Sequence, residues 1–323
     1  MMRWTRAIVL PLAALALAAG ALPAGQYGGE FLNIPVGARA YGLGGAFGPL
    51  VDDASAAYWN PAGLAALARP EVGVTHTELF GGLAVHDFIA AAWPLPRLSL
   101  GVAWIRLGVD DIPRFSHTVG TPPQGSFGDN ENALFVSAAS ARGLPAWSGM
   151  RAMTLRYGGS LKVIYDKLDD KQATGLGIDA GLQAQLPLGR PGARPSPAAS
   201  RFGAVTVGLV AADIGGTAIS WNTARQHQDV REASGRAGIA YALGIEALRA
   251  TATACYETST DELLRNRFGV ELSYRGLAAL RAGHDGQGTA LGAGISYWRL
   301  RVDYGFNRHE LGNCHRVSAA FRL

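Results

Sequence analysis

The chain has little charge, few lysines and few cysteines. Charged residues make up 17% of its 323 residues, lysine occurs only at Lys162, Lys167 and Lys171, and the cysteines are Cys255 and Cys314. Beyond the N-terminal segment, no apolar run approaches the roughly 20 residues of a membrane-spanning helix. The chain is too weakly charged for a disordered protein, and its scattered arginines form no basic stripe for nucleic acid. We therefore expect a folded protein without membrane-spanning helices and without a nucleic-acid partner.

The N-terminus has the layout of a secretory signal peptide. Arg3 and Arg6 precede an uncharged apolar run at 7–19, and small residues follow up to Ala24. A basic, an apolar and a small-residue region in that order are typical of export signals, and the apolar run is too short for a membrane anchor. We predict a signal peptide at 1–24 and export of the remaining chain.

From residue 71 to the end, apolar and polar residues alternate. In one clear segment Arg301 and Asp303 alternate with apolar residues, namely Leu300, Val302, Tyr304 and Phe306. Successive side chains of a strand point to opposite faces, so the apolar face is either buried in a soluble sandwich or turned to lipid in a barrel. The small-residue content, with 43 glycines, favours the barrel.

About fourteen such segments follow one another, each near the ten residues of a tilted transmembrane strand. They lie near 70–79, 83–93, 97–106, 131–140, 154–166, 174–186, 202–213, 233–241, 248–256, 265–274, 277–284, 289–297, 298–306 and 315–323. An even number closes an antiparallel barrel. We predict an all-β fold, a roughly 14-stranded antiparallel transmembrane β-barrel over 70–323.

Connection lengths predict the orientation of the barrel, because bacterial barrels have short periplasmic turns and longer outer loops. If the first strand runs outward, the long connections 107–130 and 214–232 lie outside, and the tight links at 94–96 and 275–276 are periplasmic. Connections 141–153 and 187–201 are longer than this pattern allows.

Charged residues fall mainly on the face predicted to line the lumen. They are Arg156, Lys162, Asp166, Asp179, Arg249, Glu271, Arg301, Asp303 and Arg316. They either pair with one another and with the plug, or guide the headgroup of an amphipathic ligand. Cys255 and Cys314 fall on strands about five places apart, although a disulfide needs Cα atoms within about 7 Å. We expect free or separately buried thiols.

Residues 25–69 do not alternate and carry the most specific sequence. Its blocks are Gly29-Glu30-Phe31-Leu32, Val36-Gly37-Ala38-Arg39-Ala40, Gly42-Leu43-Gly44-Gly45-Ala46-Phe47 and Asp52-Asp53-Ala54 followed by Tyr58-Trp59-Asn60-Pro61-Ala62-Gly63-Leu64. Asp52 or Asp53 is predicted to cap a short helix that ends before Pro61. Asn60 is predicted to cap a second turn with Pro61 at the first helical position. The segment is therefore predicted to form short helices joined by turns at glycine residues.

These blocks resemble the N-terminal signature of the PorV/PorQ family, within the superfamily of FadL-like outer-membrane proteins. The resemblance implies that 25–69 is an N-terminal plug of short helices in the lumen of a fourteen-stranded barrel. It also matches Asn60-Pro61-Ala62 to the plug motif of FadL-like transporters. The candidate ligand-binding or plug residues are Phe47, Trp59, Asn60, Pro61 and Ala62. The aromatic residues, with Phe31 and Tyr58, either line an apolar pocket or anchor the plug, and Asn60-Pro61-Ala62 either touches a ligand or only shapes a turn.

No motif indicates catalysis, a metal or a cofactor. Gly42-Leu43-Gly44-Gly45 lacks the dinucleotide-binding spacing, and no phosphate loop, zinc-protease helix or nucleophile elbow occurs. His309 and His315 have no further ligands at metal-site spacing. We therefore expect no catalytic residues, no cofactor and no enzymatic activity.

The resemblance implies two alternative functions in the outer membrane of a Gram-negative type of cell, in contact with its lipid. One is a PorV-like role in type IX-like protein secretion, whose partners are secreted cargo proteins and other secretion-system components. The alternative is FadL-like passive transport of fatty acids or other hydrophobic compounds. A third interpretation, a purely structural barrel or a soluble exported β-domain, keeps the alternation without transport.

Overall fold

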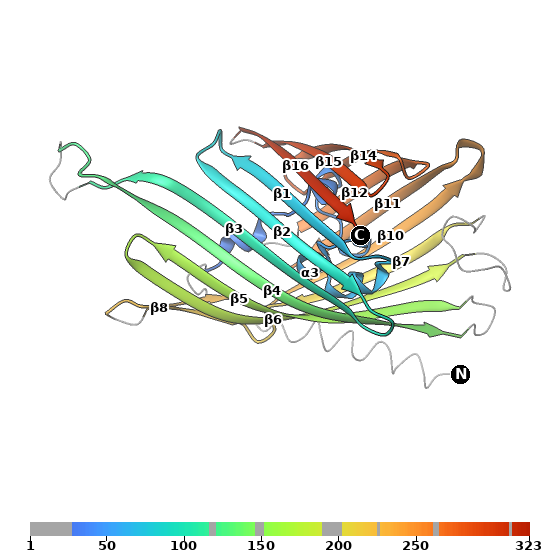
Figure 1. Ribbon diagram of the computed structural model, residues 1–323, viewed down its shortest axis with the longest axis horizontal. Helices are drawn as coiled ribbons and strands as arrows, with labels where there is room; N and C mark the ends of the chain where they lie inside the picture. The colour runs from blue at the N-terminus through green and yellow to red at the C-terminus, as the bar shows by residue number, and fades with distance from the viewer. Residues whose placement is uncertain are drawn as a thin grey trace.

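The strands form one closed barrel (Figure 1). The computed structural model describes residues 28–115, 121–145, 152–188, 202–224, 227–260, 265–309 and 312–323, so the predicted signal peptide lies outside the described residues. The first and last strands, β1 (Glu71–Leu79) and β16 (Gly312–Arg322), pair antiparallel, and the β5–β6 ladder completes the ring. Within the described ranges fourteen strands make up the wall. The predicted all-β, fourteen-stranded antiparallel barrel is confirmed.

Each of the fourteen predicted segments coincides with one strand of the wall. The others are β2 (Ala84–Pro94), β3 (Ser99–Pro113), β4 (Ser126–Leu144), β5 (Met153–Leu168), β6 (Lys171–Pro187), β7 (Ala204–Ala212), β10 (Ser234–Ile245), β11 (Ala250–Ser259), β12 (Arg265–Tyr274), β13 (Ala278–His284), β14 (Thr289–Tyr297) and β15 (Leu300–His309). A hairpin of β8 (Thr217–Trp221) and β9 (Gln228–Arg231) is added through the edge of β6.

The alternation has the predicted direction. On β5, Leu161 and Val163 are 54% and 47% exposed, whereas Lys162 and Ile164 between them are 3% and 0% exposed. Since a sheet turns alternate residues to opposite faces, the apolar set faces outward and the charged set faces the lumen. The same holds on β15, where Val302 is exposed and Asp303 is buried.

Exposed aromatic side chains mark one rim of the wall. They are Trp93, Tyr157, Phe202, Tyr241, Tyr274, Tyr297 and Trp298, all close to the turns predicted to be periplasmic. Transmembrane barrels carry such girdles where the wall meets the membrane–water interface. We therefore place this rim at the inner surface of the membrane.

At the opposite rim, β3 to β6 continue beyond the apolar zone. Outward-facing residues on β3 change from Leu100 and Val102 to Arg106, which is paired with Asn132 of β4. The outer ends of the strands and the added hairpin, which we call the outer platform, comprise Arg106–Pro113, Ser126–Asn132, Tyr165–Thr174 and Thr217–Arg231. These ends, with β8, reach the left side of Figure 1, well past the tips of β1 and β2.

The prediction that residues 107–130 and 214–232 form outer loops is therefore wrong. Much of 107–130 is a continuation of the β3–β4 ladder, with a register shift between Val109 and Ile112, and 214–232 holds the β8–β9 hairpin. Strands outside the membrane have water on both faces, so they need no alternation of apolar and polar residues. A search for that alternation therefore does not find them. Connections 141–153 and 187–201 lie partly outside the described residues.

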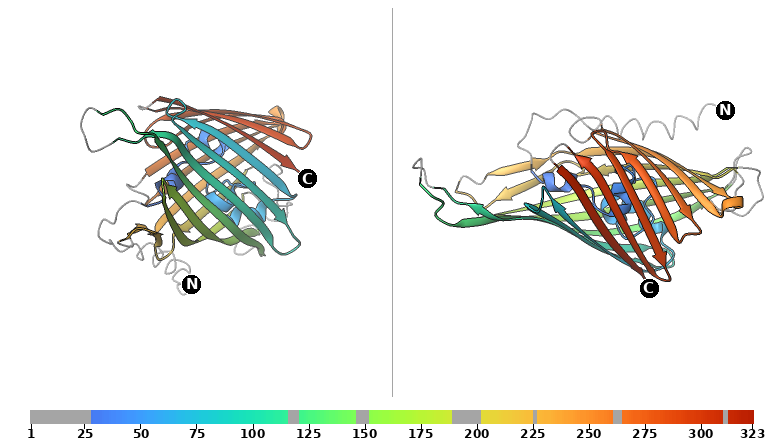
Figure 2. Two further views of the ribbon diagram at one scale, coloured as in Figure 1. Left: turned by 60° about the vertical axis from the view of Figure 1, so that its left-hand side comes forward. Right: turned by 90° about the horizontal axis from the view of Figure 1, so that it is seen from above.

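Short helices lie inside the ring of strands, as both views of Figure 2 show. They are η1 (Glu30–Asn33), α2 (Ala38–Gly42), α3 (Ala56–Trp59) and η2 (Pro61–Ala66). We refer to residues 28–67 as the plug. In the part of the chain that the structure describes, no helix is long and apolar enough to cross a membrane.

Candidate functional site

The aromatic residues of the plug pack against one another. Phe47 and Trp59 are 1% and 2% exposed, and their ring centroids lie 5.8 Å apart at 81°. Tyr58 packs edge-on against Trp59, and Trp59 Nε1 donates a hydrogen bond to Val36 O at 3.1 Å. Edge-to-face pairs of this kind add to the stabilisation from burial. The candidate aromatic residues thus form the hydrophobic centre of the plug.

Asn60 begins the second helical turn as predicted. Its Oδ1 accepts a hydrogen bond from Ala62 N at 3.1 Å, and Pro61 stands at the start of η2. The predicted cap by Asp52 or Asp53 is displaced: the residue directly before α3 is Ser55, which makes no side-chain cap, whereas Asp53 Oδ1 accepts a hydrogen bond from Ser55 N at 3.0 Å in the turn that leads into the helix. The Asp53 carboxylate also accepts a hydrogen bond from Ser55 Oγ. It forms an ion pair with Arg301 of the barrel wall, a long-range partner that local spacing does not reveal.

The Asn60 amide also fastens the plug to the wall. Its Nδ2 donates to Leu182 O of β6 at 3.1 Å and to Gly48 O of the plug at 3.2 Å. Gln183, the next residue of β6, donates from Nε2 to Gly48 O and Val51 O at 3.0 and 3.1 Å. Both polar atoms of the buried Asn60 side chain therefore bond to protein groups.

A belt of glycines on the inner wall lets the backbone and, at Gly101, Gly181 and Gly238, the side chains of the plug pack closely against the strands. In the order in which the plug passes them, they are Gly305, Gly292, Gly283, Gly269, Gly238, Gly208, Gly181, Gly158 and Gly101. A Cβ at Gly305 would lie 2.8 Å from Ala38 O, and one at Gly208 would lie 2.7 Å from Pro49 Cα. Glycine in a strand commonly marks such a close backbone approach. The plug therefore winds around the inside of the wall from β15 to β3.

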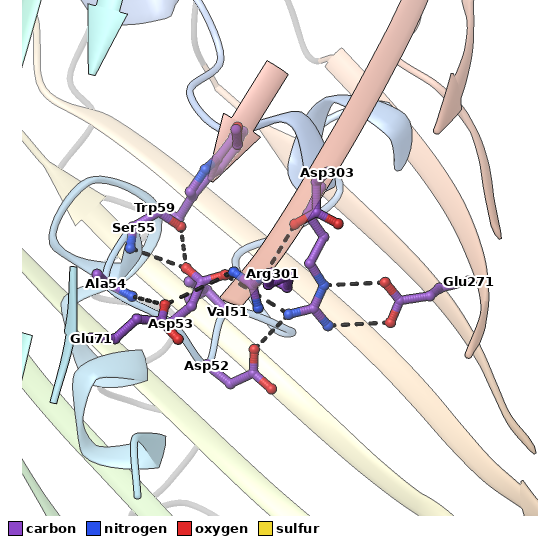
Figure 3. A network of polar contacts seen from close by, with 12 residues as sticks. Val51, Asp52, Asp53, Ala54, Ser55, Trp59, Glu71, Glu271, Arg301 and Asp303 are labelled. Carbon is purple, nitrogen blue, oxygen red and sulfur yellow. Dashed lines mark hydrogen bonds and ion pairs between the residues drawn. The ribbon is translucent and has the colours of Figure 1, made fainter. Parts of the chain in front are cut away.

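Ion pairs bind the plug to the strands on the side away from Asn60 (Figure 3). Glu271 accepts hydrogen bonds from Arg39 Nε and Nη2 of the plug at 3.1 and 3.2 Å, and from Arg281 Nε at 2.6 Å. Arg301 Nη2 donates to Asp53 Oδ2 at 2.8 Å. Burial alone would raise the pKa of Asp53, but Arg301 and Arg39 outweigh it and hold that pKa below its ordinary value. Asp53 is therefore ionised at neutral pH and binds the plug to β15.

A second charged group lies towards the outer platform. Lys162 Nζ is 3.0 Å from Asp179 and 2.7 Å from Asp213, and Asp213 also binds Arg231 at 2.8 Å. Arg231 donates to Gly29 O of the plug at 2.8 Å. These groups border a cavity of about 50 Å³ that Tyr58 and Trp59 also line. Such a volume suits a few water molecules and not a lipid.

The outside of the wall carries a larger groove near Asn60. It measures about 450 Å³ and is lined by small and apolar residues, among them Leu98, Ala138, Gly159, Ala180, Leu182 and Ala211. Gly158 and Gly181, which are direct partners across β5 and β6, lie between this groove and Asn60-Pro61. At this point only the glycine backbone separates the plug from the lipid-facing surface.

Most predicted lumen charges face the lumen, with Arg249 as the exception. Arg249 is exposed in the turn before β11 at φ 48°, because the strand begins at Ala250, two residues later than predicted. The sequence analysis did not single out Arg281 or Asp213. The alternation of its strand turns Arg281 to the lumen, whereas Asp213 lies at φ 52° after β7 and departs from the alternation of that strand. Cys255 and Cys314 are free and buried, and no three potential ligand side chains group to hold a metal ion within the described ranges.

Solved structures identify the architecture. The chain is similar to a FadL homologue of Pseudomonas aeruginosa, with 11% identity, 90% of this chain and 99% of that chain covered, and a TM-score of 0.51. The chain has the fold of FadL-like outer-membrane β-barrels. This FadL-like barrel is also similar to the Ralstonia pickettii toluene transporter TbuX, with 11% identity, coverage of 89% and 98%, and a TM-score of 0.47.

Sequence comparison matches only the N-terminal part of the chain. A model of an uncharacterised protein family, UPF0164, matches residues 19–90, which include the plug and most of the first hairpin of the FadL-like barrel. No curated protein matches the chain.

Proposed function

We propose that this FadL-like barrel is a non-catalytic component of protein export that receives secreted proteins at the cell surface, as in type IX-like secretion. The observation that carries the proposal is the contrast between a lumen occupied by the plug and an exterior extended by long strands. The plug touches the inner wall at nine glycines, whereas β3 to β6 have 15, 19, 16 and 17 residues. About 9–11 residues suffice to span the membrane.

The match at residues 19–90 supports this proposal, because UPF0164 is the family to which PorV/PorQ proteins belong. The extra length of β3, from Arg106 to Pro113, corresponds to roughly 25 Å of strand at about 3.3 Å per residue. A projection of that size is suited to a macromolecular partner and is not needed to move a small molecule.

The outer platform also favours one kind of partner surface. Its described residues include eight carboxyl groups and four cationic side chains; burial raises the pKa of Glu131 to about 8 and that of Asp166 to about 7, so the remaining six carboxylates supply the negative charge. Complementary charge steers association and weakens as salt screens it. The cargo domain that docks here is therefore expected to present a basic face.

The test is affinity purification of the full-length protein from its native outer membrane in mild detergent. We expect co-purifying secreted proteins that share one C-terminal domain. Their yield should fall at least about tenfold, or 1.4 kcal/mol, when exposed Asp110 and Asp170 are both replaced by lysine. Glu246→Lys, on the opposite rim, is the matched control and should leave the yield unchanged. Equal recovery from all three proteins, or no shared domain, would contradict the proposal.

A second candidate, passive transport of a hydrophobic compound, is favoured by the outer groove beside Asn60-Pro61. Its volume of about 450 Å³ falls within the range of small-molecule sites. Ala180→Leu, on the outward face of β6, would fill the groove without touching the plug. If the groove is an exit, this variant should reduce release of an apolar fluorescent probe into liposomes while cargo recovery is unchanged. Unaltered release would remove this candidate.

A further inference from the structure

Three buried polar side chains form a row across β2, β1 and β16. His86 and Arg316 are the direct cross-strand partners of Thr77, one on each side. Directly opposed residues of antiparallel strands place their Cβ atoms about 4.5–5.5 Å apart. All three face the lumen and each is only 1% exposed. The ring of Tyr41, from α2 of the plug, covers the row, with the Arg316 guanidinium 4.2 Å from its centroid.

The row holds several hydrogen-bonding atoms without a partner. Arg316 Nε and Nη1, His86 Nε2 and Thr77 Oγ1 make no hydrogen bond. Nor does Arg316 form an ion pair with any carboxylate that the structure describes. Two other buried lumen arginines differ, since Arg281 forms ion pairs with two carboxylates and Arg301 with three.

An unpaired buried charge costs several kcal/mol, so Arg316 is expected to have a counter-ion. A guanidinium supplies N–H donors and a fixed positive charge, a threonine hydroxyl turns to donate, and an imidazole can present an N–H. Together these groups suit an anion and repel a cation. Tyr41, Leu79, Ala84 and the buried thiol of Cys314 surround the row with mostly apolar surface, so a ligand here would have to be an ion of few atoms and could not carry an alkyl chain.

We propose that Arg316, Thr77 and His86 form a binding site for one small inorganic anion of about the size of chloride. The anion would neutralise the guanidinium beneath Tyr41 and so stabilise the contact between α2 and the wall. The site lies apart from both the outer platform and the outer groove. It therefore stands or falls independently of the proposed roles in export and transport.

Crystals of the full-length protein grown with bromide in place of chloride provide a direct test, because bromide scatters anomalously. We expect an anomalous peak within hydrogen-bonding distance of Arg316 Nε or Nη1 in the unmodified protein. The peak should vanish in Arg316→Gln and weaken in Thr77→Val, which keeps the shape of the side chain. Arg299→Gln, in the exposed β14–β15 turn, is the matched control and should retain it. Ordered water alone at this position in the unmodified protein would overturn the proposal.

Thermal unfolding supplies a second measurement. Replacing gluconate with bromide at constant ionic strength should raise the Tm of the unmodified protein by about 2 °C, as for a ligand present at several times its Kd. The rise in Tm should persist in Arg299→Gln, be smaller in Thr77→Val and be lost in Arg316→Gln. If Arg316→Gln fails to fold, the peak in the unmodified protein and the response of Thr77→Val still decide the question. An equal rise in all variants would indicate a general salt effect and reject the site.

Discussion

Replacing Gly208 with alanine is expected to destabilise the protein by about 2–3 kcal/mol, whereas the same change at Gly73 is expected to stabilise it slightly. A Cβ at Gly208 would lie 2.7 and 2.8 Å from Cα and N of Pro49, so plug backbone or wall must shift. Overpacking a well-filled interior costs about this much. Equilibrium unfolding in urea, in detergent or lipid, measures the difference.

Gly73 is a matched control because it also faces the lumen from a strand, β1. Its added Cβ would meet Ala319 O and Ala320 Cβ only at 3.8 and 3.9 Å, which is ordinary contact. Alanine there removes the entropic disadvantage of glycine, for a gain of about 0.5–1 kcal/mol. Changes of opposite sign in the free energy of unfolding would show that the glycine belt is needed for the plug to pack against the wall. Equal effects would show that glycine in this wall serves only the strands themselves.

Much of the barrel could be predicted because lipid and lumen impose different chemistry on alternate residues. Leu161 and Val163 against Lys162 is such a contrast, and it survives any error of one or two residues in strand ends. The outer platform lacks that contrast, so 107–130 and 214–232 read as loops. Arg249 was placed wrongly for a related reason: alternation shows which residues of a strand share a face, but not where the strand begins or ends.

The contacts of the plug were less predictable. Asn60 and Pro61 were identified as a capped turn from local chemistry, which the structure confirms. The partners of Asn60 and Asp53 in the wall lie more than one hundred residues away, at Leu182 and Arg301, and no local pattern encodes them. The glycines of the belt were visible at inward positions such as Gly158 and Gly181. Only the structure shows that the plug passes each one in turn.

Replacing Glu271 with glutamine is expected to destabilise the protein by about 3–5 kcal/mol, the cost of removing one partner from a buried ion pair. Glu271 is 9% exposed and accepts hydrogen bonds from Arg39 and Arg281, so its loss leaves two buried guanidiniums with one fewer carboxylate. Both arginines keep a partner in Asp52 and Asp303 respectively, which places the expected loss towards the lower end of that range. Urea unfolding measures it.

Asp170→Asn is the control for this change, since the Asp170–Lys171 pair has a similar distance of 2.8 Å but the Asp170 side chain is 71% exposed. Exposed pairs contribute little, so no measurable change is expected there. A double variant, Glu271→Gln with Arg39→Gln, then separates two explanations. If the loss comes from an uncompensated charge between plug and wall, removing Arg39 should recover part of it, and the two effects will not add. Strict additivity would mean that Glu271 acts within the wall, through Arg281, and that the plug is held by its backbone contacts with the glycine belt.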